Sequence, residues 1–137
     1  MALDLPVTAN IPPDYLADAN LRLEIYRRIA AGEEDDREIL EELCDRFGKP
    51  PQPVRRLIEV ASLKRLAERM RVQTISMRGG FLQIRMRRDS PVDPERLIRM
   101  VSELPGASFS PGGVLAVPAG SGAAAVAAAR DTLERLA

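Results

Sequence analysis

The chain has 137 residues, 45% of them hydrophobic, and its 20 acidic and 20 basic side chains give a formal net charge of zero. Such a chain is expected to form one packed domain, and it has no run of about 18 apolar residues that would span a membrane. It contains no histidine and a single cysteine, Cys44, which excludes an internal disulfide, the common zinc sites and a cysteine–histidine nucleophile pair. Enzyme chemistry would need carboxylates, serine or lysine alone, no residue stands out as a nucleophile, and we expect a non-enzymatic protein with no metal and no cofactor. The segment MALDLPVTA lacks the pattern of a secretory signal, so the cytoplasm is the expected compartment.

The first half of the chain predicts an extended arm and three helices. Residues 1–13 end in two prolines, which favour extended backbone. Apolar residues recur at helical spacing over residues 20–31, 35–47 and 53–70. Short links between them predict a three-helix subdomain over residues 14–70. The residues that start or stop these helices are Asp18 or Asn20, Gly32, Gly48 and Pro53.

The second half, residues 71–137, changes to the period of β-strands. A double-glycine turn at residues 79–80 predicts a hairpin with one buried and one basic face. Helices are expected after Asp93-Pro94 and after Ser121, with two short strands between them. The predicted order is β-β-α-β-β-α, with strands over residues 72–77, 81–87, 108–109 and 114–117, a helix opened by Asp93-Pro94 and a final helix capped by Ser121. We thus predict a single α+β domain over residues 1–137, in which the three-helix subdomain precedes a small, mostly antiparallel sheet.

The charges are unevenly distributed along the chain. Gly32–Phe47 contains eight acidic and two basic residues, whereas Lys49–Arg88 contains eleven basic and two acidic residues. The basic segment suggests a nucleic-acid-binding module, with Arg85, Arg87 and Arg88 as possible contacts. Against this, aromatic residues are nearly absent from the segment and the pI is only 6.3. A solvated face, a protein contact and a nucleic-acid contact all remain open for these arginines.

The acidic segment places its carboxylates on one side of the second predicted helix. At 100° per residue, Glu38, Glu41 and Asp45 lie within about 40° of Glu34, and Glu42 lies within about 80°. The opposite side is apolar, and Cys44 is expected to be buried there as a small hydrophobic residue.

Like charges four residues apart repel, and Asp45 also faces the negative end of the helix dipole. Along this helix, Arg46 next to Glu42 is the only basic residue expected to reduce the repulsion. The acidic face is therefore either a solvated surface or a docking surface for a basic partner. Exposed acids on one helix lack the cleft that a paired-carboxylate hydrolase needs.

Two runs, PPDYLADANLRLEIYRRIA and EELCDRFGKPPQPVRRLIEVASLKRLAERM, resemble the C-terminal domain of the bacterial transcription-repair coupling factors (Mfd). The family patterns are P-x-x-Y/F-I/L-x-D-x-N-x-R-L-x-x-Y-x-R-I and E-L-x-D-R-F-G-x-x-P. The resemblance covers about residues 6–71 and is loose beyond them. The matching residues are Pro13, Asp18, Asn20, Arg22, Leu23, Tyr26, Arg28, Ile29, Glu42, Leu43, Asp45, Arg46, Phe47, Gly48 and Pro51.

The resemblance implies a regulatory domain of a larger, ATP-driven translocase on double-stranded DNA. In this family the full protein displaces stalled RNA polymerase and recruits UvrA for nucleotide excision repair, and its motor motifs lie in other domains. The C-terminal domain packs on an N-terminal UvrB-homology module, covers the UvrA-binding surface and restrains the motor. By resemblance, Glu42, Asp45 and Arg46 are expected to contact that module, with Glu38 and Glu41 on the same face. No membrane contact is expected.

Overall fold

The computed structural model describes residues 1–120 and 123–137, and it divides the chain into two compact units. One unit is Val7–Ser62, and the other combines Met1–Pro6 with Leu63–Ala137. Helix α3, Gln52–Arg69, contributes residues to both units.

The unit Val7–Ser62 contains helices α1 (Ala19–Ala31) and α2 (Asp36–Phe47) and the first part of α3. Side-chain caps determine where the first two helices begin. The Asp18 carboxylate accepts hydrogen bonds from the backbone N–H groups of Asn20 and Leu21 at 2.9 and 3.2 Å. Asp35 caps α2 in the same way. The buried core of this unit consists of Ile11, Leu16, Ile25, Ile29, Ile39, Leu43, Val54 and Ile58.

Two tyrosines hold the irregular segment that precedes α1. The Tyr15 hydroxyl lies 3.1 Å from the carbonyl oxygen of Leu43 and 2.9 Å from that of Gly48, at the end of α2. The Tyr26 hydroxyl accepts a hydrogen bond from the Ile11 N–H at 2.8 Å. Burial raises the pKa of the Tyr15 phenol above its usual range, so this group remains a donor. The bond to Tyr26 satisfies a backbone N–H of the irregular segment, and the bonds from Tyr15 satisfy carbonyl groups at the end of α2.

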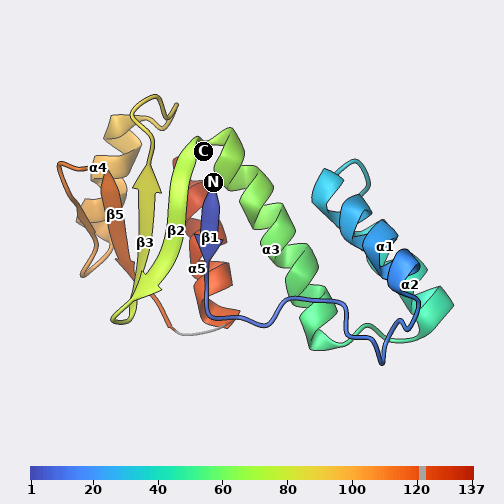
Figure 1. Cartoon of the computed structure of the whole chain (residues 1–137). Helices are drawn as coiled ribbons and strands as arrows, with labels where there is room; N and C mark the ends of the chain where they lie inside the picture. Colours follow the sequence, from blue (N-terminus) through green and yellow to red (C-terminus); the bar gives the residue numbers. More distant parts are fainter. Residues whose placement is uncertain (121–122) are drawn as a thin grey trace. The chain divides into compact units, whose positions relative to one another are not determined.

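The other unit is built on a five-stranded sheet of order β1-β2-β3-β5-β4. Strand β1 runs parallel to β2, and every other neighbouring pair is antiparallel. Helices α4 and α5 lie on one side of this sheet (Figure 1). The elements are β1 (Ala2–Asp4), β2 (Val72–Arg78), β3 (Phe81–Met86), α4 (Pro94–Glu103), β4 (Ser108–Phe109), β5 (Val114–Pro118) and α5 (Ala123–Leu136).

Alternation along the strands produces one buried face in this unit. Ile84 pairs with Ile75 on one side and with Leu115 on the other, and all three are fully buried. The residues between them, such as Gln83 and Arg85, retain exposure because successive strand residues point to opposite faces. The buried face packs against α4 and α5, whose inward side chains include Leu97 and Leu133.

The structure confirms the predicted α+β class and the mostly antiparallel sheet. The sequence predicts residues 1–13 only as an extended arm, whereas residues 2–4 form strand β1 and pair with β2. The predicted cap Ser121 lies outside the described residues. The expected burial of Cys44 is wrong, because this side chain is exposed. On the helical wheel Cys44 lies about 100° from the buried Leu43, which places it at the edge of the apolar side rather than at its centre.

Replacing Gly48 with asparagine is expected to lower the free energy of unfolding by about 1–3 kcal/mol, because its angles, φ 86° and ψ −175°, are essentially restricted to glycine. The matched variant Gly32→Asn should lose clearly less, since Gly32 has left-handed helical angles, φ 66° and ψ 21°, that asparagine tolerates. Urea unfolding, monitored by circular dichroism, measures the free energy of unfolding of both variants. Equal losses in the two variants would contradict this explanation.

Candidate docking surface on helix α2

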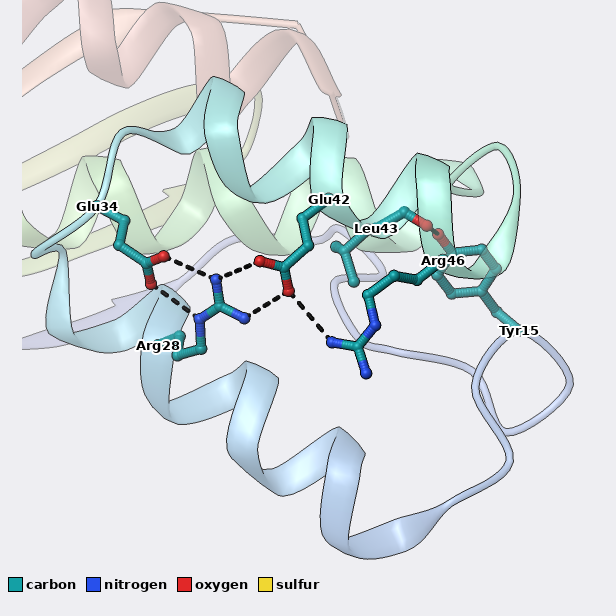
Figure 2. Close-up of polar contacts among 6 residues, drawn as sticks. All are labelled: Tyr15, Arg28, Glu34, Glu42, Leu43 and Arg46. Atoms are coloured by element: carbon teal, nitrogen blue, oxygen red, sulfur yellow. Dashed lines mark hydrogen bonds and ion pairs between the residues drawn. The ribbon is translucent and has the colours of Figure 1, made fainter.

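A single arginine from α1 joins two carboxylates at the start and middle of the α2 region. Arg28 donates to Glu34 from Nε and Nη2 at 2.8 and 2.7 Å. It also donates to Glu42 from Nη1 and Nη2 at 2.7 and 3.0 Å. Figure 2 shows the guanidinium between the two carboxylates. Both contacts are bidentate, which is the strongest arrangement available to an arginine–carboxylate pair. We call these three residues the Arg28 clamp.

Arg46 extends the clamp along α2 (Figure 2). Its Nη1 lies 3.3 Å from the Oε2 of Glu42, one helical turn away. Its guanidinium carbon also lies 5.0 Å from the centre of the Phe47 ring, within the range of a cation–π contact. Arg46 therefore has two weak partners and stays 47% exposed, whereas Arg28 is 24% exposed.

The clamp changes the titration of its members. Hydrogen bonds from Arg28 lower the pKa of Glu34 and of Glu42 below their usual range, and those bonds raise the pKa of Arg28. Along α2 itself Arg46 pairs with Glu42 as expected, and a second, closer pair comes from outside the helix. The main relief comes from α1, because the short link after Gly32 turns the chain back and brings the end of α1 next to α2.

The remaining carboxylates of the predicted acidic face are in a different situation. Glu38, Glu41 and Asp45 are exposed, and in the part of the chain that the structure describes they make no ion pair or side-chain hydrogen bond. They share one side of α2. We call these three residues the acidic surface. The predicted docking residues thus form two groups. The acidic surface has no partner among the described residues, whereas Glu42 and Arg46 form ion pairs within the unit.

The predicted nucleic-acid contacts are exposed but partly neutralised. Arg87 lies 3.6 Å from Asp89, which also accepts from Arg71 at 2.5 Å. The hydrogen bond from Arg71 lowers the pKa of Asp89. Arg85 lies 3.5 Å from the carbonyl oxygen of Gly112. Only Arg88 has no such partner among the described residues.

Within residues 1–120 and 123–137, no group of three or more acidic or cysteine side chains lies close enough to hold a metal ion. No helix in the same residues is long and apolar enough to cross a membrane.

Comparison with known proteins identifies the family. The family model described as the TRCF domain matches residues 5–97. This chain belongs to the TRCF-domain family. The match confirms the resemblance found in the sequence and extends it beyond residue 71, through the hairpin and into α4.

Curated relatives are named transcription-repair-coupling factors. The protein of Haemophilus influenzae is 36% identical over 107 residues, which cover 75% of this chain. That of Mycobacterium tuberculosis is 54% identical over 67 residues, which cover 47% of this chain. These alignments cover 9% and 5% of the two relatives, so the chain corresponds to a small part of such proteins.

The fold also matches a solved structure. The crystal structure of a C-terminal domain of transcription-repair coupling factor superposes with a TM-score of 0.77 and covers 98% of this chain and 92% of its own. At 22% identity this likeness shows a shared fold. The TRCF-domain fold therefore includes both the helical unit and the sheet unit.

Replacing Arg28 with methionine tests the clamp, because methionine keeps much of the apolar stem and removes the guanidinium. The melting temperature at neutral pH is expected to fall by roughly 2–6 °C. The matched variant Arg27→Met, which changes an exposed neighbour, should change it little.

The pH dependence provides a second readout. Because the pKa values of Glu34 and Glu42 are lowered on folding, their contribution is fully present above the unfolded glutamate pKa of about 4.3. It is lost as the pH falls through the lowered folded values. Below about pH 5 the wild type should therefore lose stability more steeply than Arg28→Met. Parallel pH profiles for the two proteins would rule out the clamp as a source of stability.

Proposed function

We propose that this chain is a regulatory, non-enzymatic docking domain of a transcription-repair coupling factor. In this proposal the acidic surface binds a basic face of the UvrB-homology module of the same protein. Docking masks the surface that binds UvrA and restrains the ATP-driven translocase that displaces stalled RNA polymerase. Membership of the TRCF-domain family supports a role within a transcription-repair coupling factor. The division of the α2 carboxylates into paired and unpaired groups supports the choice of docking surface.

The observation that carries the proposal is the contrast between paired and unpaired acids on one helix. Arg28 pairs with Glu42 within the unit, while Glu38 and Asp45 are exposed and have no ion-pair partner among the described residues. A purely solubilising face gains nothing from Asp45, which lies at the negative end of the helix dipole. A basic partner removes both the mutual repulsion and the dipole penalty when it binds.

A contact made through exposed charges is also suited to release. A charge pair at an exposed rim contributes about 0–1 kcal/mol, whereas losing one member of a buried, hydrogen-bonded pair costs about 2–5 kcal/mol. Several pairs of intermediate burial hold two parts of a protein together and still allow separation when other partners compete. Arg46 fits such an interface, because its bond to Glu42 is long and it can turn to a carboxylate of the partner.

The experiment is a calorimetric titration of this chain with the separately expressed UvrB-homology module. Asp45→Ala and Glu38→Ala are each expected to weaken binding roughly three- to ten-fold, while their melting temperatures remain that of the wild type. Glu42→Ala should weaken binding and also lower the melting temperature, because it breaks the Arg28 clamp. The matched control is Glu24→Ala, an exposed acid on α1, which should change neither quantity.

The same titration is repeated at increasing salt concentrations. Binding through exposed charges is expected to weaken as the ionic strength rises, because screening shortens the range of the attraction. The docking proposal fails if Asp45→Ala and Glu38→Ala bind the module as the wild type does. Binding of DNA by this chain, lost in Arg88→Glu, would instead support the nucleic-acid alternative.

A further inference from the structure

The sheet unit contains a surface hollow of about 370 Å³ that the proposed function does not use. Its walls come from the end of β3, the link that follows it, the first turn of α4, and β4 with the turn that leads to β5. The volume lies in the range of ligand-binding sites in proteins, about 300–1,000 Å³.

The walls of the hollow are mainly apolar. Leu97 of α4 is nearly buried at 8% exposure, and Phe109 of β4 remains 42% exposed. Ile98, on the same side of α4 as the lining residue Pro94, is 69% exposed. Of the four large hydrophobic residues that are exposed among the described residues, Phe109 lines the hollow, and Ile98 lies one helical turn along α4 from the lining residue Pro94. Exposed apolar side chains that gather at a depression are typical of a binding surface.

The charged part of the lining has one sign. Arg87 and Arg88 line the hollow, and no acidic residue does so. Arg88 has no ion-pair partner among the described residues, and Arg87 has only a 3.6 Å contact with Asp89, which Arg71 approaches more closely. The nearby Asp93 is engaged by its own helix, where it accepts from the Glu95 N–H at 3.0 Å. The hollow therefore combines apolar walls with two arginines, Arg87 and Arg88, that have at most one weak ion pair within the described residues.

We propose that this hollow binds an acidic peptide segment of a partner protein. A bulky apolar side chain of the segment enters the hollow between Leu97 and Phe109, and its neighbouring carboxylates pair with Arg87 and Arg88. An extended segment also covers Ile98, which a ligand confined to the hollow would leave in water. This inference does not rest on the docking of α2, because it uses different residues and a partner of the opposite charge.

The chemistry of the walls favours a peptide over nucleic acid. Single-stranded nucleic acid binds on rows of aromatic rings beside a basic groove, and Phe109 is the one aromatic residue in this lining. The phosphates of a duplex would use the two arginines and gain nothing from the apolar walls. An acidic segment with an apolar anchor uses both parts of the site.

The test is a selection of phage-displayed random short peptides on the 137-residue chain, followed by titration of the most enriched sequence as a synthetic peptide. The enriched peptides are expected to combine aspartate or glutamate with a large apolar residue. Affinity for the synthetic peptide should fall at least roughly ten-fold in Arg88→Glu, because this change reverses a contacting charge. The matched control Arg99→Glu changes an exposed arginine of α4 that does not line the hollow, and it should have little effect.

Amide chemical shifts provide a readout of position. The synthetic peptide should shift the signals of Gly112 and Gly113, which line the hollow, and Phe109→Ser should weaken its binding. The proposal is overturned if no acidic peptide is enriched, or if Arg88→Glu binds the peptide as tightly as Arg99→Glu does. It is also overturned if a random-sequence DNA oligonucleotide shifts the same glycines and competes with the peptide, because the site would then bind phosphates.

Discussion

The Arg28 clamp is the interaction on which the acidic character of α2 depends. Five donors in a rigid, planar fork allow one guanidinium to bind two carboxylates bidentately, and the rounder ammonium of a lysine cannot do so. The single positive charge of Arg28 is shared by Glu34, which precedes α2, and Glu42, which lies on it, so the acidic segment carries less unbalanced charge than its sequence suggests. The clamp also joins the end of α1 to the middle of α2, and it adds to the packing that buried Ile25, Ile29, Ile39 and Leu43 provide in the same unit.

This arrangement separates two tasks that the sequence places on one helix. The carboxylates nearest to α1 stabilise the unit, and those turned outward are available to a partner. A partner that binds the outward acids does not have to break the clamp, because Glu38, Glu41 and Asp45 have no partner to lose among the described residues. Binding and release can therefore occur without a change in the fold of the unit. Glu42 and Arg46 lie at the boundary, where a substitution affects both tasks.

Most of the fold could be predicted from the sequence because strong local signals mark its elements. Asp18, Asp35 and Asp93 cap three of the helices, and Gly32 and Gly48 end two of them. The Arg28 clamp could not be predicted from local sequence signals, because Arg28 and Glu42 are 14 residues apart and no local pattern joins them. The short links predict a three-helix subdomain, but they do not indicate which side chains of α1 and α2 meet. Strand β1 has only three residues, and its partner lies some seventy residues further along the chain.

The uneven charge of the sequence has a structural counterpart in two surfaces of opposite sign. The acidic surface lies in the unit Val7–Ser62, and Arg87 and Arg88 line the hollow in the other unit. The three exposed carboxylates of the acidic surface would attract a basic partner electrostatically, and salt screens such an attraction strongly. The hollow adds buried apolar area to its two charges, and that part of the binding free energy persists at high ionic strength. Ionic strength is therefore expected to weaken the proposed docking at α2 more than the proposed peptide binding at the hollow.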